Sequence, residues 1–113
     1  MPLIQDTPRL QPMTLTALLE YAEGDRADKT LANTAGAAIF LLALDAGQSV
    51  PEHAPPGDAL MQILEGDVRV MADGSPIELC AGQALVIPAG AKRSPIAKTK
   101  AKLLITLIKQ LAV

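Results

Sequence analysis

Short apolar segments alternate with turn signals along most of the chain. From residue 24 onward, a glycine recurs every eight to twelve residues between segments rich in Ile, Leu, Val and Ala. This spacing is typical of an all-β sandwich or barrel. Asp73-Gly74 predicts a hairpin turn between VRVMA and PIELC, and Glu65-Gly66 predicts a second tight turn. The remaining turn signals are Gly24, Gly36, Gly47, Pro56-Gly57, Gly82 and Pro88-Ala-Gly90.

The N-terminal region has a different pattern. Its first dozen residues include three prolines, which predict an arm running over a surface. Residues 14–20 predict one short helix with Thr14 as its N-cap. The 113 residues suit one structural domain. Within it we expect an arm, a short helix and a first strand over residues 1–34, and the main barrel over residues 35–111.

Two apolar segments, residues 39–44 and 103–108, show no alternation of apolar and polar positions. Such a pattern is typical of a strand that is covered on both faces. The inner face of a small barrel is its core, so something must also cover the outer face. A second subunit is the expected cover, which predicts a homodimer. The arm or the short helix of the same chain is the alternative.

Composition limits the kind of core and the classes of partner that we expect. Half of the residues are hydrophobic but only Tyr21 and Phe40 are aromatic, so the core must be aliphatic. The net charge of −2 and the lack of tryptophan argue against a nucleic-acid partner. The apolar segments are too short to span a bilayer and the first residues lack a signal-peptide pattern, so we expect a cytoplasmic protein without a membrane partner. Cys80, the single cysteine, lies in an apolar segment and is expected to be buried and inert.

Charge is unevenly distributed along the chain. All twelve acidic residues lie at or before Glu78, and six basic residues follow without an acid. Lys98, Lys100 and Lys102 alternate with small residues, which predicts that they share one face. A basic surface for nucleic acid is one interpretation. We favour the other, in which late strands lie beside early ones and these lysines meet the early carboxylates.

The turn residues also form two motifs with fixed spacing. Gly47 is followed after five residues by His53, and Gly66 lies thirteen residues beyond it. Gly82 is followed after five residues by Pro88-Ala-Gly90. In this order and spacing the motifs resemble those of the cupin superfamily, specifically its small, single-domain, RmlC-like members. The resemblance covers about residues 36–110 and implies a jelly-roll barrel, also called a double-stranded β-helix, which can enclose a cavity.

The resemblance also implies a metal cage of three histidines and one carboxylate, but this chain departs from it. His53 lies at the first histidine position, whereas Pro55, Ala59 and Arg93 lie at the second histidine, the glutamate and the third histidine positions. Proline and alanine side chains offer no donor atom, and a guanidinium has no lone pair and repels a cation. Asp58 is one residue from the glutamate position, so strand alternation turns it the other way unless a bulge at Gly57 shifts the register. We therefore expect no metal and no other cofactor.

The resemblance places His53 and Arg93 together at the mouth of the barrel. Arg93 is a candidate to hold a carboxylate or phosphate through paired N–H groups, and His53 to add a hydrogen bond or act as a base. An apolar cavity with few polar groups is a common form of ligand pocket. The candidate ligand-binding residues are His53, Arg93, Ala59, Met61 and Ile63, with Phe40, Leu85 and Ile87 as further wall residues.

Three functions fit these residues. The favoured one is a metal-free barrel that binds or senses a small anionic organic molecule. An enzyme is the first alternative, either metal-dependent or using His53, of dioxygenase or isomerase type. A structural or interaction scaffold is the second. At the level of single residues, His53 capping its own loop and Arg93 pairing with a carboxylate or pointing to solvent are the alternatives to a pocket.

Overall fold

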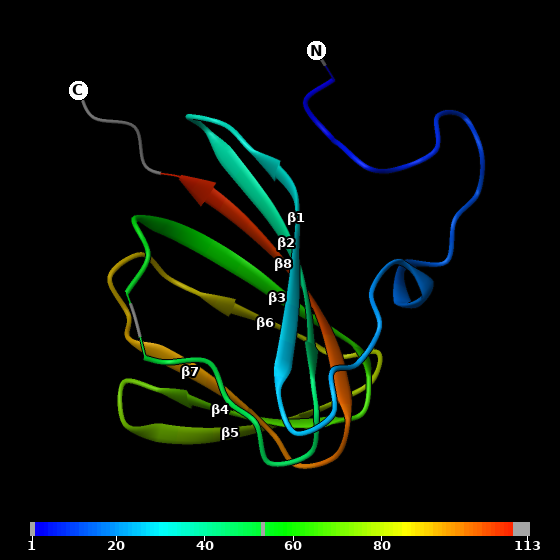
Figure 1. Cartoon of the computed structure of the whole chain (residues 1–113). Coiled ribbons are helices and arrows are strands. Elements are labelled where there is room, and N and C mark those ends of the chain that lie inside the picture. The colour runs from blue at the N-terminus through cyan, green and yellow to red at the C-terminus, as the bar shows by residue number, and fades with distance from the viewer. Residues whose placement is uncertain (1, 53, 110–113) are drawn as a thin grey trace.

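The computed structural model describes residues 2–52 and 54–109, and these form two antiparallel sheets that lie in two layers (Figure 1). The all-β class expected from the turn spacing is confirmed, although residues 110 and 111 of the expected barrel lie outside the described part. The larger sheet has the order β1 (Arg26–Asn33), β2 (Ala37–Leu44), β8 (Ala101–Lys109), β3 (Gly57–Glu65) and β6 (Ala84–Ile87). The smaller sheet has the order β5 (Ser75–Cys80), β4 (Asp67–Ala72) and β7 (Arg93–Ala97).

The core between the sheets is aliphatic, as the scarcity of aromatic residues requires. Along β3 the buried side chains are Ala59, Met61 and Ile63, each at most 2% exposed, and the residues between them are less buried. This alternation turns one face of the strand into the barrel. Leu103 and Ile105 of β8 lie in the same buried cluster, and β8 pairs with β3 on one side and with β2 on the other.

The two predicted tight turns have different roles. Asp73 and Gly74 have φ angles of 48° and 82° and join β4 to β5, so this hairpin prediction is confirmed. Glu65-Gly66 instead carries the chain from β3 in one sheet to β4 in the other, and therefore forms a corner. The turn predicted at Pro56-Gly57 is present only in part, because Pro56 lies in a bend but Gly57 is the first residue of β3 and pairs with Lys109.

The N-terminal arm covers part of the outer face of the larger sheet. Leu31, Leu41 and Ala43 are at most 3% exposed, yet they lie outside the cluster that fills the barrel. The arm is anchored near them at two points. The backbone N–H of Gln5 donates to the carbonyl of Leu31 at 2.7 Å, and a lysine of β8 holds residue 16. The alternative prediction, in which the arm of the same chain covers the sheet, therefore holds over this part of the outer face.

The second anchor is the buried Lys102, which is 8% exposed. Its Nζ donates to the carbonyl of Thr16 at 2.5 Å and lies 4.8 Å from the ring centre of Tyr21. The Tyr21 hydroxyl in turn donates to Glu65 at 2.6 Å, and burial together with this carboxylate raises the pKa of Tyr21. The predicted helix is a single 3₁₀ turn, η1 (Leu15–Leu18), which Thr14 precedes without a side-chain capping hydrogen bond.

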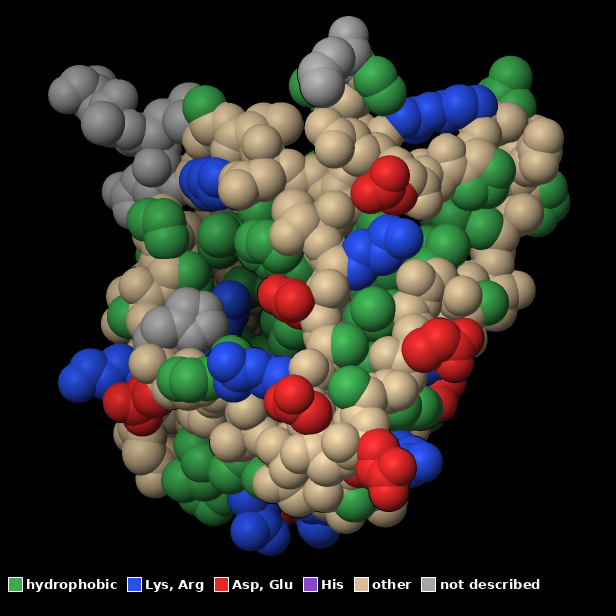
Figure 2. All heavy atoms as spheres, viewed as in Figure 1, with side chains coloured by type: hydrophobic (Ala, Val, Ile, Leu, Met, Phe, Trp, Pro, Cys, Tyr) green, Lys and Arg blue, Asp and Glu red, His purple; other side chains and the backbone are tan. Residues whose placement is uncertain are grey.

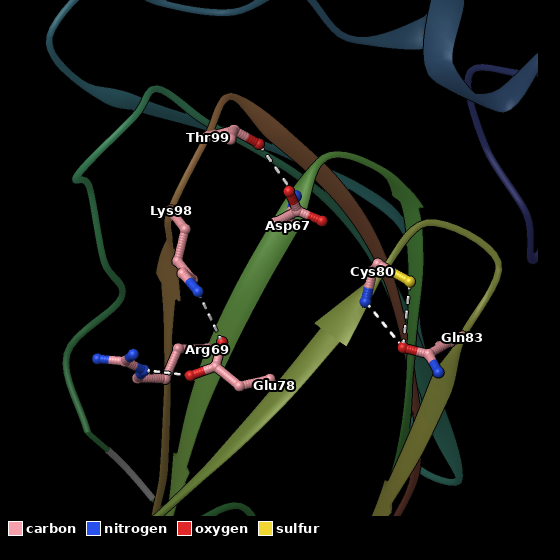
Figure 3. A network of polar contacts seen from close by, with 7 residues as sticks. All are labelled: Asp67, Arg69, Glu78, Cys80, Gln83, Lys98 and Thr99. Carbon is pink, nitrogen blue, oxygen red and sulfur yellow. Dashed lines mark hydrogen bonds and ion pairs between the residues drawn. The ribbon is translucent and has the colours of Figure 1, made fainter.

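On the face shown in Figure 2, acidic and basic side chains are dispersed among hydrophobic ones. Glu78 of β5 accepts hydrogen bonds from Arg69 Nε at 2.5 Å and from Lys98 Nζ at 3.2 Å (Figure 3), and these cations lower the pKa of Glu78. A late lysine thus meets an early carboxylate, as we favoured. The three alternating lysines do not share one exposed face, because Lys98 and Lys100 are exposed and Lys102 is buried.

The expected burial of Cys80 is wrong. On β5 the side chain of Leu79 is buried and that of Cys80 is exposed, because successive residues of a strand face opposite ways. The Cys80 thiol lies 3.3 Å from the amide oxygen of Gln83, and Figure 3 shows Cys80 at the end of β5 and Gln83 on the segment that leads into β6. Within the described residues, no helix is long and apolar enough to cross a membrane.

Two glycines allow close backbone contacts that no other residue permits. A Cβ atom added to Gly57 would overlap the carbonyl oxygen of Ile108, and one added to Gly66 would overlap that of Lys100. Gly57→Ala and Gly66→Ala should each lower the free energy of unfolding by about 1–3 kcal/mol. Gly36→Ala is the matched control, since nothing lies within 4 Å of its added Cβ. Urea denaturation of the three variants measures this, and equal stability of all three would contradict the close contacts.

Candidate functional site

A cavity of about 150 Å³ lies inside the barrel. Strands of both sheets contribute to it: β2, β3 and β8 of the larger sheet and β7 of the smaller one. The face of the molecule shown in Figure 2 is hollowed, and hydrophobic side chains and a basic one are visible inside the hollow. Of the seven lining residues that the structure describes, six are apolar, so this part of the wall is almost entirely hydrocarbon. The lining residues are Phe40, Leu42, Val50, Met61, Arg93, Pro95 and Ile105.

Arg93 is the charged residue of this wall. It is the first residue of β7, where Arg93, Pro95 and Ala97 are buried and the two residues between them are less so. Arg93 is only 3% exposed, and its Nε and Nη1 atoms have no hydrogen-bond partner among the residues that the structure describes. Burial lowers the pKa of the Arg93 guanidinium, but an arginine keeps its proton in proteins. The cavity therefore contains a positive charge that the described part of its wall does not neutralise.

The chain segment after β2 closes the cavity on the side of β7. The N–H of Ala97 donates to the carbonyl of Gln48 at 2.9 Å, and the N–H of Val50 donates to that of Pro95 at 3.2 Å. The Ser94 hydroxyl donates to the carbonyl of Val50 at 2.6 Å. These bonds attach residues 48–50 to the edge of the smaller sheet. They place the Val50 side chain on the cavity wall, beside the β7 residues that also form it.

The structure brings together only part of the predicted site. Arg93 and Met61 line the cavity, as does the wall candidate Phe40. Ala59 and Ile63 are buried at 1% and 2% exposure, but they belong to the core rather than to this wall. His53 lies outside the described residues. Ile87 is buried in the same core cluster, and Leu85 is partly buried and packs against that cluster.

Sequence reasoning missed four residues of the wall, for two reasons. Leu42 and Ile105 lie in the strands without alternation, so their sequence does not indicate which face points inward. The position of Val50 on the cavity wall depends on the pairing of its loop with β7, which no local sequence pattern indicates. Pro95 was within reach, because it lies two residues from Arg93 on a strand and so faces the same way.

The residues at the positions of the metal cage that the resemblance implies do not suit a metal ion. Pro55 and Ala59 are buried and offer no donor atom, and Arg93 brings a cation. Asp58 is exposed, and its carboxylate accepts the N–H of Ala89 at 2.9 Å, so it faces away from the cavity. Over residues 2–52 and 54–109, no group of three or more His, Cys, Asp or Glu side chains lies close enough to hold a metal. His53 falls outside these ranges.

Two antiparallel sheets around an internal cavity define a small jelly-roll barrel with one cationic group inside. Residues 40–109 match the model of the Cupin_2 family, described as a cupin domain, and the chain belongs to this family. The match spans strands β2 to β8 almost completely. No curated protein matches the chain.

Solved structures support the same assignment. A conserved protein of unknown function from Streptococcus pyogenes superposes with a TM-score of 0.94 at 27% identity, over 99% of this chain and 98% of that one. A cupin superfamily protein from Desulfitobacterium hafniense gives 0.89 at 27% identity, over 95% and 98% of the two chains. A cupin 2 conserved barrel domain protein from Leptotrichia buccalis gives 0.83 at 31% identity, over 86% of this chain and 47% of that one.

Arg93 should reduce the stability of the barrel that contains it. A buried polar group without a partner costs about 1–3 kcal/mol, and more when it is charged. Arg93→Met replaces it with an apolar side chain of similar length, so the free energy of unfolding should rise by at least about 1 kcal/mol. Arg69→Met is the matched control, because Arg69 lies exposed on β4 and its loss should change stability little. Urea denaturation measures both, and a less stable Arg93→Met variant would show that Arg93 has a structural partner.

Proposed function

We propose that the protein is a metal-free binding or sensing cupin, and that its cavity receives a small organic anion at Arg93. The observation that carries the proposal is a guanidinium, 3% exposed and with two nitrogens unpaired among the described residues, on the wall of an otherwise apolar cavity. A ligand carboxylate or phosphate would supply the missing acceptors, and charge-assisted hydrogen bonds of this kind are strong. Apolar walls with one fixed charge are also a common arrangement for orienting a small molecule.

The enzyme alternative depends mainly on His53, whose surroundings the structure does not describe. Metal-dependent chemistry of the dioxygenase or isomerase type would need ligands that Pro55, Ala59 and Arg93 do not provide. A metal-free reaction with His53 as base would still use the anion site at Arg93. Stoichiometric metal in the purified protein, or a turnover that His53→Ala abolishes, would favour the enzyme over the binding barrel. The cytoplasmic location stays a prediction from the sequence.

An anion should stabilise the protein through Arg93. We expect chloride, nitrate, phosphate and a set of organic carboxylates to include at least one anion that raises the melting temperature at millimolar concentration. An anion at a hundred times its Kd would add about 2.7 kcal/mol to the free energy of unfolding. The shift should vanish in Arg93→Met and persist in the control Arg69→Met. Shifts of equal size in both variants would mean that the anions act elsewhere, and the proposal would be wrong.

We also propose that the protein forms a homodimer through its arm. The outer face of the larger sheet keeps an apolar patch, here called the outer patch, made of Leu60, Val86 and Ile108, which are 38%, 64% and 60% exposed. Leu60 and Val86 are cross-strand partners, and Ile108 on β8 lies diagonally across from Leu60, so the patch crosses three adjacent strands. Between its anchors at residues 5 and 16, the arm passes to the side of its own barrel (Figure 1) and exposes Leu10 completely.

A second copy is the occupant that fits both features. In a two-fold dimer each arm can lie on the outer patch of its partner, which buries the same two surfaces twice. Leu3, Met13 and Leu10 supply apolar side chains on the arm, with exposures from 43% to 106%. The outer patch supplies the complementary surface on the barrel. This dimer would complete the cover that the arm provides only in part within one chain.

Light scattering after size-exclusion chromatography tests the dimer. The full chain should have twice the mass of one 11.8 kDa chain. Val86→Lys, at the most exposed residue of the outer patch, should shift the mass toward that of the monomer. Ser75→Lys is the matched control, since it places the same charge on an exposed residue of the other sheet. A monomeric wild-type protein, or a Val86→Lys variant that remains fully dimeric, would contradict the proposal.

A further inference from the structure

We infer that the ligand is a short aliphatic monocarboxylate, with its carboxylate on Arg93 and a hydrocarbon body of about four to six carbons in the cavity. This inference rests on the function proposed above and adds the class of the anion. It follows from three properties of the cavity: the chemistry of its wall, its volume and the number of its charges.

The wall selects a ligand with a single polar end. Apart from Arg93, every lining side chain that the structure describes is apolar, and none of these can donate or accept an ordinary hydrogen bond. A hydroxyl or amide on the ligand body would lose its water and gain no partner among these described side chains, which is unfavourable. Sugar acids and hydroxy acids are therefore poor ligands for this wall. A plain hydrocarbon body is a good one, because it replaces water against Phe40, Leu42 and Ile105.

The volume limits the length of that body. The cavity measures about 150 Å³. An apolar cavity of about this volume in another protein holds one benzene molecule, which has six carbon atoms. A chain of about four to six carbons therefore fills the space beside the guanidinium, and a longer chain must extend out of it. Below that length, each added CH₂ should tighten binding about fourfold through the apolar surface it buries.

The charge selects one carboxylate over other anions. A planar carboxylate matches the planar guanidinium and can accept two hydrogen bonds from it. Nε and Nη1 of Arg93 lack partners among the described residues, and each shares an edge of the guanidinium with Nη2, so a carboxylate would take one of these two edges. A second carboxylate on the same ligand would have to lie against apolar side chains, where a charge is strongly disfavoured. Phosphate, with a charge near −2, would keep part of its charge unpaired for the same reason.

Calorimetric titration of the full-length protein with a carboxylate series tests this inference. The series is acetate, butyrate, pentanoate, hexanoate and decanoate, with succinate, 2-hydroxybutyrate, phosphate and nitrate for comparison. Affinity should rise about fourfold per CH₂, reach its maximum at pentanoate or hexanoate, whose bodies have four and five carbons, and fall for decanoate. Succinate and 2-hydroxybutyrate should bind at least tenfold more weakly than butyrate. Arg93→Met should abolish binding throughout.

A second variant tests the position of the chain inside the barrel. Val50→Phe adds bulk to the wall from a loop segment rather than from a strand, and should move the optimum to a shorter acid. Ser49→Phe is the matched control, because Ser49 is exposed and its side chain is absent from the cavity wall. The optimum should stay unchanged in that control. An unchanged optimum in Val50→Phe as well would place the hydrocarbon chain elsewhere and overturn the inference.

The outcomes separate this inference from the proposed function. Binding of nitrate or phosphate that depends on Arg93, without any gain from added CH₂ groups, would overturn the ligand class and leave the anion site intact. Tighter binding of succinate or 2-hydroxybutyrate than of butyrate would do the same. If no anion binds in a way that Arg93→Met abolishes, both the ligand class and the anion site are wrong.

Discussion

An uncompensated positive charge inside an aliphatic barrel is the constraint on which the rest of this structure depends. Burying a guanidinium without acceptors is unfavourable, and the two sheets must outweigh that cost with apolar burial alone. They do so with small and branched side chains packed between the layers, and with an arm that covers part of the outer face. A residue that is costly to stability and central to a cavity is typical of a binding or catalytic site.

The position of Arg93 is fixed by backbone contacts rather than by partners of its side chain. Strand β7 pairs with β4 on one edge, and residues 48–50 attach to its other edge. Both edges hold the strand so that Arg93 and Pro95 face the cavity. Since no described side chain holds the guanidinium, its nitrogens stay available to a ligand, while the strand that carries it is rigidly placed. Such placement on a strand keeps a site more precise than placement on a loop.

Much of the fold follows from turn chemistry, and much of the site does not. Glycine spacing predicted the all-β class, and the Asp73-Gly74 hairpin was confirmed in detail, because these conformations depend on one or two residues. Gly57 was misread because a glycine that allows close strand contact looks the same in sequence as one that turns. Cys80 was misread because an apolar segment hides the register that decides which face is inside. The wall residue Val50 depends on pairing between distant segments, which the sequence encodes only through the whole fold.

The exchange of a histidine position for Arg93 changes what this barrel can do with a ligand. A divalent metal bound by the expected cage and a guanidinium both attract an anion. The metal, however, also offers open coordination positions and can polarise a bound group, whereas the guanidinium only donates hydrogen bonds from a fixed plane. With Pro55, Ala59 and Arg93 at these positions, the site keeps a positive charge that attracts an anion. These three residues offer no atom that could coordinate a metal. In the proposed function, the same barrel interior would hold an anion in one orientation, and the apolar wall around Arg93 would decide which anion fits.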